Sequence, residues 1–314
     1  MKVLEIKDLK IDFKKRNSFM SVVQGLDLNI SESEIVGIAG ESGSGKTIST
    51  LALADLLPDG NSRMSYKSYR IKSNKVDKKQ IPYFRGRLIS YIFQDPIPSL
   101  DPMFTIRYQL KEILKVGSRK KVDDKTMDKL LLDVGLKDRE RVLASYPHQL
   151  SGGMAQRVAI AFALGSNSKI LVADEPTTAL DAHIKKGILD LLKKLRDERG
   201  LSIFFISHDL EQTFYIADRI YIFYAGSIME YAKSSVIKRK PLHPYTRALL
   251  DCIPRRGIEE LKQIRGKSPD FSSLPKGCLF YPRCPYAMDI CQKKRPPLIE
   301  VNKGHFLSCF KEKI

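Results

Sequence analysis

One stretch of the sequence has the residue types and spacing of a phosphate-binding loop. Residues 40–47 read GESGSGKT, a G-x-x-x-x-G-K-T pattern, and they follow a short apolar run at Ile35–Ala39. Glycines let backbone N–H groups converge on a phosphate without Cβ clashes, and a helix that follows adds its positive dipole end. Lys46 would place its charge on the β- and γ-phosphates, and the Thr47 hydroxyl would ligate Mg²⁺. The stretch predicts a nucleotide-phosphate site.

Two acidic residues lie at the end of a second apolar run. Residues 170–174 read ILVAD, so Asp174 ends a predicted buried strand and Glu175 comes next. One carboxylate in such a place can support the Mg²⁺ shell, while its neighbour accepts a proton from an attacking water. The pair predicts hydrolytic chemistry on the bound nucleotide.

Two further polar residues also follow predicted strands. Gln94 comes after residues 89–93, ISYIF, and His208 comes shortly after residues 202–206, SIFFI. Ligands of open α/β sheets lie outside the carboxyl ends of the strands. Both side chains are therefore candidates for the nucleotide site, His208 as a contact of the γ-phosphate.

A second glycine-rich segment supplies another candidate anion site. Residues 150–157 read LSGGMAQR, and the apolar run at 158–164 continues as a predicted helix. Ser151, Gly152 and Gly153 thus stand at a helix N-terminus, where backbone N–H groups are open to an anion.

The elements that must position these residues alternate between strand and helix patterns. Residues 4–13 and 22–30 alternate apolar and polar side chains, as half-buried antiparallel strands do. Phe13, or else Phe19, is a candidate to stack on an adenine ring, although strands also bury aromatic residues routinely.

Helical patterns fill the region between the strands that carry Gln94 and Asp174. Residues 105–135 show apolar positions at helical spacing, with Asp123 or Asp124 as the predicted N-cap. Further helices are expected after the phosphate loop, through Leu56, and from an opening at residues 179–181 to a stop at Gly200. This alternation indicates an α/β protein with a helical subdomain.

Composition and charge limit the class of protein but do not choose a partner. The chain has 314 residues, 43% hydrophobic and 29% charged, as expected for a globular protein of about two domains. We find no signal-peptide pattern, and the longest apolar run, 158–164, is far below the ~20 residues that span a bilayer. A cytoplasmic location is therefore expected. The net charge of +18, of which +11 lies in residues 233–314, suits nucleic acid, anionic lipid or an acidic partner equally well.

Four of the five cysteines gather near the C-terminus. Cys278, Cys284, Cys291 and Cys309 are spaced C-x₅-C-x₆-C-x₁₇-C, whereas Cys252 lies in a predicted helix and is expected in its core. In a cytosolic chain, clustered thiols indicate Zn²⁺ or an iron–sulfur cluster before a disulfide. The residues alone leave a third possibility open, four free buried thiols that act as small hydrophobes.

The order of these motifs resembles the ATP-binding-cassette (ABC) ATPases. The resemblance rests on GESGSGKT at 40–47, YIFQDP at 91–96, LSGGM at 150–154, ILVADEP at 170–176, TALD at 178–181 and SHD at 207–209. It implies an α/β fold with a RecA-like core, an antiparallel β subdomain and a helical subdomain at about 95–165. Residues 1–232 would form this nucleotide-binding domain, and residues 233–314 a cysteine-containing C-terminal extension.

The family resemblance implies a role for each matching residue. Thr47, Gln94 and Asp174 would hold Mg²⁺, Glu175 would be the general base, and His208 would sense the γ-phosphate. With the aromatic candidate included, the expected ATP-binding residues are Phe13, Gly40, Glu41, Ser42, Gly43, Ser44, Gly45, Lys46, Thr47 and Ile48. Ser151, Gly152 and Gly153 would contact the ATP held by a second cassette, so that hydrolysis is a two-subunit event.

The downstream segments resemble one subgroup, the ATP-binding subunits of oligopeptide, dipeptide and nickel importers. HPYTRALL at 243–250 and GCLFYPRCPYAMDICQ at 277–292 carry this resemblance, and methionine after the glycine pair is typical of the first of two paired cassettes. It implies a heterodimer with a second ABC ATPase on the cytoplasmic face of the membrane. It further implies two permease subunits, an extracellular solute-binding protein as an indirect partner, and a [4Fe–4S] cluster on the four tail cysteines, with Zn²⁺ as the alternative.

Three other functions compete with peptide import. A nickel importer would share the whole motif set, a soluble ABC protein of nucleic acid or ribosomes would suit the basic charge, and an exporter cassette would lack the cysteine tail. A single set of motifs argues against the soluble class, whose members usually carry two cassettes in one chain. Nucleic acid is therefore not expected as a partner.

Overall fold

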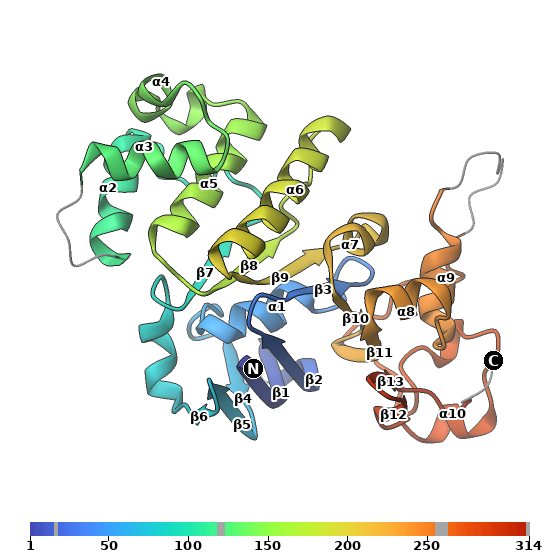
Figure 1. Ribbon diagram of the computed structural model, residues 1–314. Coiled ribbons are helices and arrows are strands. Elements are labelled where there is room, and N and C mark those ends of the chain that lie inside the picture. Colours follow the sequence, from blue (N-terminus) through green and yellow to red (C-terminus); the bar gives the residue numbers. More distant parts are fainter. Residues whose placement is uncertain (16–17, 118–122, 255–262, 312–314) are drawn as a thin grey trace. The chain divides into compact units, whose positions relative to one another are not determined.

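The computed structural model describes residues 1–15, 18–117, 123–254 and 263–311 (Figure 1). The chain forms two compact units that alternate along the sequence. The first comprises Met1–Ser31, Ile35–Val76 and Ile206–Ile314, and the second comprises Glu32–Glu34 and Asp77–Phe205. Because neither unit ends at residue 232, the predicted boundary between nucleotide-binding domain and extension stays a prediction.

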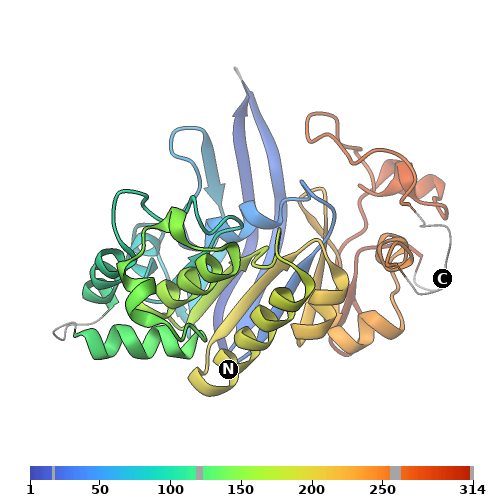
Figure 2. The same ribbon diagram turned by 90° about the horizontal axis from the view of Figure 1, so that it is seen from above.

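An antiparallel sheet in the first unit confirms the alternating pattern near the N-terminus. Its strands are β1 (Lys2–Lys15), β2 (Ser18–Ser31), β4 (Ser62–Ser65), β5 (Ser68–Ile71) and β6 (Asn74–Lys75), paired β2-β1-β5-β6 with β4 also on β1. Figure 2 shows β1 and β2 as a long hairpin. The buried positions shift from Leu4 and Ile6 to Leu9 and Ile11, because the register slips near Asp8, whose φ is 51°.

A second set of strands in the first unit pairs in the order β12-β13-β11-β10-β3. These are β3 (Ile35–Ala39), β10 (Arg219–Tyr224), β11 (Ser227–Lys233), β12 (Ile299–Asn302) and β13 (His305–Leu307). All five residues of β3 are buried, and β3 runs parallel to β10. A continuous apolar run is typical of a parallel strand with both faces covered.

The helices of the first unit include those of the C-terminal extension (Figure 1). They are α1 (Lys46–Leu51), the 3₁₀ helix η1 (Ala52–Ala54), α7 (Leu210–Ile216), α8 (Ser234–Arg239), α9 (Pro244–Asp251), the 3₁₀ helix η4 (Tyr281–Arg283) and α10 (Asp289–Lys293). The α-helix after the phosphate loop is shorter than predicted. Asp55 takes a left-handed φ of 52°, and the Leu56 N–H donates to the Leu51 carbonyl at 2.9 Å, which closes the helix as a Schellman motif does.

The second unit contains three strands, β7, β8 and β9, and a group of helices. The strands are β7 (Ile89–Ile92), β8 (Ile170–Asp174) and β9 (Ser202–Ser207), whose last two residues belong to the first unit. The helices are η2 (Lys78–Phe84), α2 (Ile106–Gly117), α3 (Asp124–Asp133), α4 (Arg139–Ala144), η3 (Pro147–Gln149), α5 (Gly152–Gly165) and α6 (Ala182–Arg199). Figure 1 shows α2 to α5 gathered together, as the helical pattern predicts.

Helix ends in the second unit follow local capping chemistry. Asp123 is the N-cap of α3 and accepts the Thr126 N–H at 2.9 Å, whereas residues 118–122 lie outside the described residues. The helix predicted to open at residues 179–181 has its N-cap at the last of them, Asp181, whereas Ala179 has a φ of 59° and lies outside α6. Gly200 ends α6 with a φ of 63°, as predicted.

Candidate functional site

The phosphate loop lies between β3 and α1 in the first unit. Gly40, Gly43 and Gly45 have φ angles of 153°, 74° and 95°. A Cβ at Gly40 would lie 2.2 Å from the carbonyl oxygen of Phe223, so the loop can pass β10 only with glycine there. The backbone between strand and helix is thus free to turn its N–H groups toward a ligand.

Lys46 lies at the centre of this loop. Its side chain is buried, and its Nζ donates to the carbonyl oxygens of Gly40 and Glu41, both at 2.9 Å. Buried ammonium groups need such acceptors, because desolvation of an unpaired charge is costly. Thr47 is exposed at the first turn of α1, where its hydroxyl can reach a cation beside the phosphates.

Glu41 makes its contacts with the C-terminal extension. Its backbone N–H donates to the Tyr245 hydroxyl at 2.9 Å. Its carboxylate accepts two hydrogen bonds from the Arg283 guanidinium, at 2.6 and 2.9 Å. Sequence reasoning did not identify Tyr245 and Arg283, although both stand in the HPYTRALL and YPRC segments that set this chain's subgroup apart.

The acidic pair of the second unit lies where the sequence predicts it. Asp174 ends β8 with 4% of its surface exposed, and the Tyr91 hydroxyl donates to its Oδ2 at 3.0 Å. Glu175 follows in a left-handed conformation with a φ of 46°. Such a conformation is costly for a residue other than glycine and is found where a side chain must be aimed.

Gln94 and Glu175 lie side by side. Strands β7 and β8 run parallel, so the residues that follow them meet at one sheet edge. Gln94 Nε2 donates to Glu175 Oε2 at 3.2 Å, and the Thr178 hydroxyl donates to the same oxygen at 3.0 Å. The two donors hold the carboxylate in a defined place, as a general base requires. Thr178 was not predicted as a site residue, although it opens the TALD motif.

The LSGGM segment begins helix α5. The Ser151 hydroxyl caps the helix by accepting the Met154 N–H at 3.4 Å, and Ser151 and Gly152 are exposed. Gly153 is buried, since a Cβ there would lie 3.1 Å from Ile184. Ser151 and Gly153 line a cavity of about 550 Å³ together with the basic side chains of Arg157 and Lys186. The acidic Asp190 also lines this cavity, so its lining carries both signs of charge.

The remaining ATP candidates occupy the first unit. His208 is exposed between β9 and α7, and Asp209 caps α7 by accepting the Gln212 N–H at 3.1 Å. Phe13 is half-buried on β1, opposite Met20 of β2. The other aromatic candidate, Phe19, has the Arg63 guanidinium 4.1 Å from its ring centre.

Four cysteines of the extension line one small enclosed cavity of about 10 Å³. They are Cys278, Cys284, Cys291 and Cys309, none of them in a disulfide. Burial raises the pKa of the Cys278 thiol to about 11 and also raises those of Cys284 and Cys309. As the described side chains are placed, no group of three or more His, Cys, Asp or Glu could hold a metal ion. Cys252, expected in a core, is only half-buried at the end of α9.

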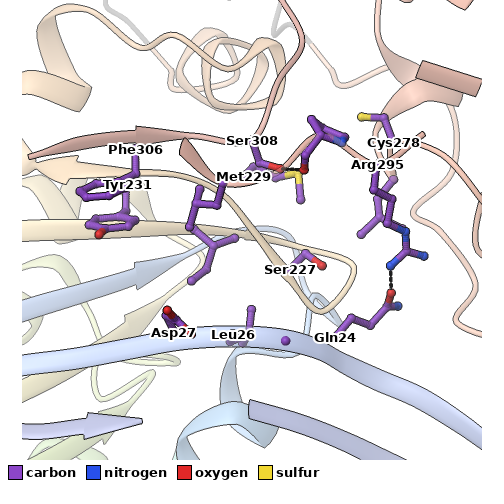
Figure 3. A pocket seen from close by; sticks show the side chains of 15 residues that line it. Gln24, Leu26, Asp27, Ser227, Met229, Tyr231, Cys278, Arg295, Phe306 and Ser308 are labelled. Carbon is purple, nitrogen blue, oxygen red and sulfur yellow. Dashed lines mark hydrogen bonds between the residues drawn. The ribbon is translucent and has the colours of Figure 1, made fainter. Parts of the chain in front are cut away.

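A larger cavity of about 330 Å³ lies between the extension and strands β2 and β11 (Figure 3). Its lining includes Asp27 and Met229, with Cys278, Arg295 and Phe306 from the extension. The Arg295 guanidinium donates to Oε1 of Gln24, as the dashed line in Figure 3 marks. This contact ties the extension to strand β2 of the antiparallel sheet. Over the described part of the chain, no helix has the length and apolar character of a membrane span.

Comparison with known proteins matches both parts of the chain. Residues 23–178 match the ABC transporter family, and residues 229–291 match the family of the oligopeptide/dipeptide transporter C-terminal region. The oligopeptide transport ATP-binding protein AppD of Bacillus subtilis is 39% identical over 98% of this chain and 96% of its own length. The dipeptide transport ATP-binding protein DppD of Haemophilus influenzae is 40% identical over 95% and 92%.

A solved structure supports the fold assignment. The chain resembles a post-hydrolysis dimer of the ATP-binding cassette MJ0796 bound to ADP and phosphate, with a TM-score of 0.64 and 29% identity. The match covers 74% of this chain and 98% of that one. The phosphate loop, the Gln94–Glu175 pair and these relatives agree, and the chain therefore belongs to the ATP-binding subunits of ABC transporters, in the group with an oligopeptide/dipeptide transporter C-terminal region.

Proposed function

We propose that this chain hydrolyses ATP to power the import of oligopeptides or dipeptides through a membrane permease. The observation that carries the proposal is the likeness to peptide transport ATP-binding proteins over nearly the whole length, C-terminal region included. The site geometry adds the chemistry, because Gln94 and Thr178 hold the Glu175 carboxylate at the end of β8.

Each candidate residue has a role in the proposed reaction. Residues 40–48 bind the triphosphate, and Phe13 stacks on the adenine ring. Thr47, Gln94 and Asp174 would hold Mg²⁺, which supplies positive charge to the phosphate oxygens when bound. Glu175 takes a proton from the water whose oxygen attacks the γ-phosphorus, and ADP leaves. His208 contacts the γ-phosphate.

We further propose the partners of the chain. Ser151, Gly152 and Gly153 contact ATP on a second ABC ATPase, and the exposed Ser151 and Gly152 N-terminus of α5 is open to such a contact. The assembly lies at the cytoplasmic face of the membrane with two permease subunits, and an extracellular solute-binding protein delivers the peptide. The names of the two relatives described above refer to oligopeptide and dipeptide transport.

The experiment for peptide import uses the complete transporter in vesicles. The chain is co-purified with its permease and second cassette, reconstituted into liposomes, and supplied with ATP on the cassette side. Uptake of labelled di- and oligopeptides should require ATP and should stop with Glu175→Gln. Uptake of nickel with no uptake of any peptide would contradict the proposal.

For the four cysteines we propose a [4Fe–4S] cluster that cross-links and stabilises the extension, with Zn²⁺ as the alternative. Four thiols around one cavity have the donor chemistry of either group, although the side chains would have to rearrange to bind it. Anaerobic purification followed by a visible spectrum and iron, sulfide and zinc analysis tests this. About four irons per chain would support the cluster. Stoichiometric zinc would replace it, and neither metal would leave four free thiols.

A further inference from the structure

The C-terminal extension holds the phosphate loop at Glu41 through hydrogen bonds. The Arg283 guanidinium approaches the Glu41 carboxylate with two nitrogens, at 2.6 and 2.9 Å, and the Arg283 side chain is only 5% exposed. A two-point pair between a guanidinium and a carboxylate fixes direction as well as distance, and it is stronger where water is excluded. The side chain of a loop residue is thus held from a segment 242 positions away.

The backbone of the same residue is held as well. The Glu41 N–H donates to the hydroxyl of Tyr245, which is fully buried at the start of α9. The Tyr245 ring packs on Tyr224 and Phe280, with ring centres 4.7 and 5.3 Å away. The acceptor that meets the loop is therefore fixed by a buried aromatic group.

These contacts lead directly to the phosphate-binding lysine. Lys46 Nζ donates to the carbonyl oxygens of Gly40 and Glu41. These two residues form the end of the loop that the extension holds. A glycine-rich loop loses much conformational freedom when it orders around a ligand. Holding Glu41 in advance reduces that loss, so less of the binding free energy is spent on ordering.

Charge supplies a second effect in the same direction. The Glu41 carboxylate lies one residue after Gly40 in a loop that must receive a triphosphate, and two negative groups repel. Arg283 neutralises this carboxylate by direct contact. Without Arg283, the loop would be looser and also more negative.

The position of Arg283 depends on the cysteine segment. Arg283 ends the 3₁₀ helix η4 directly before Cys284, and its backbone N–H donates to the Phe280 carbonyl at 3.0 Å. The turn begins at Cys278, whose carbonyl accepts the Tyr281 N–H at 3.1 Å. Two of the four clustered cysteines therefore bracket the turn that presents the guanidinium.

We propose that Arg283 and Tyr245 are positioning residues for ATP binding, which hold the phosphate loop through Glu41 and make its affinity depend on the folded state of the four-cysteine segment. The proposal needs only the ATPase activity of the family. It does not depend on which solute is transported or on what the cysteines bind.

The test measures ATP affinity and turnover separately in the complete chain. Binding is followed with a fluorescent ATP analogue and Mg²⁺, and hydrolysis by phosphate release. Arg283→Met should raise the Kd and KM for ATP about tenfold, the effect of ~1.4 kcal/mol, with kcat at saturating ATP little changed. Tyr245→Phe, which removes only the hydroxyl, should raise Kd about threefold. Arg295→Met is the matched control, because Arg295 belongs to the same extension but contacts Gln24 instead of the loop.

A double substitution separates positioning from general damage. Glu41→Gln removes the repelling charge, so Arg283→Met with Glu41→Gln should bind ATP better than Arg283→Met alone. Cys284→Ser should raise Kd in the wild-type background and should raise it less in the Arg283→Met background, where only the contact through Tyr245 is left to lose. If the Kd of Arg283→Met for ATP lies within twofold of the wild-type Kd, or if Arg295→Met raises the Kd equally, the proposal is wrong. If Arg283→Met does not fold, Arg283→Lys and Tyr245→Phe decide by the same Kd criterion.

Discussion

His243 should make the extension sensitive to mild acid. This residue is buried at the N-cap of α9, where its Nδ1 accepts the Tyr245 N–H at 3.0 Å. Burial lowers the pKa of His243 from 6.5 to about 4, against the opposing influence of the Glu230 carboxylate and a backbone hydrogen bond with Ser308. The folded extension thus keeps this imidazole neutral at a pH where an unfolded chain protonates it.

The sign and size of the effect follow from linkage. Between pH 6.5 and about 4 the unfolded state binds the extra proton, so the stability from this group is complete above pH 6.5 and is lost as pH falls. From pH 7.5 to 5.5 the loss is about 1.4 kcal/mol, or about tenfold in the unfolding equilibrium of the extension. This interval lies above the range of Glu230. Burial raises the pKa of this carboxyl, but the hydrogen bonds with His305 and with the backbone N–H groups of Leu242 and His243 outweigh burial and lower it.

The assay compares opening of α9 at the two pH values. Hydrogen exchange of the peptide that covers Pro244–Asp251, corrected for the intrinsic rate, reports the opening equilibrium. His243→Asn keeps an oxygen acceptor at the N-cap and has no proton to gain. The change in its opening equilibrium between pH 7.5 and 5.5 should therefore be about tenfold smaller than in wild type. His148→Asn, at an exposed position in the second unit, is the control. Equal pH dependence in wild type and His243→Asn would refute the buried neutral imidazole.

Three substitutions test the catalytic and docking assignments. Glu175→Gln should keep ATP binding while hydrolysis falls by on the order of 10²-fold, measured as phosphate release, and near-normal turnover would contradict its role as base. Lys46→Ala should lose nucleotide affinity as well, measured by equilibrium binding, since its charge meets the phosphates before reaction. The exposed loop 95–102 directly follows Gln94, so Ser99→Cys should cross-link to a permease subunit in the assembled transporter. Cross-links only to the other cassette would place the docking surface elsewhere.

The local structure around the candidate nucleotide residues was predictable because it is local in sequence. Strand β3, the glycine loop and helix α1 are consecutive, so the spacing of residues 40–47 alone specifies the turn. Gln94 and Glu175 are 81 positions apart, yet Glu175 directly follows β8 and Gln94 comes two residues after β7, and the parallel pairing of these strands brings them together. A rule about strand ends was sufficient for that contact.

The contacts of the extension were not predictable in this way. Arg283 and Glu41 are 242 positions apart, and neither has a periodic pattern that indicates the other. Ala179 has a φ of 59°, and α6 begins only at Ala182. The residue type does not indicate this φ, because alanine normally favours helix. For the Arg283–Glu41 pair a tertiary contact decides the outcome, so a pattern of residue types contains too little information.

A buried polar centre at Glu230 of β11 holds the extension to this strand. Glu230 of β11 is fully buried and accepts the backbone N–H groups of Leu242 and His243 at 2.8 and 3.0 Å, and its Oε1 bonds His305 Nε2 at 2.7 Å. A buried carboxylate is stable only when such partners surround it, and loss of one leaves a desolvated charge.

This centre fixes the start of α9, and α9 begins with the tyrosine that reaches Glu41. Polar bonds are directional, whereas apolar packing tolerates small shifts. A segment with few apolar residues can therefore still hold the Tyr245 hydroxyl within hydrogen-bond distance of the phosphate loop. The basic, cysteine-containing extension thereby helps to set the shape of the nucleotide site, in addition to its place at the edge of the fold.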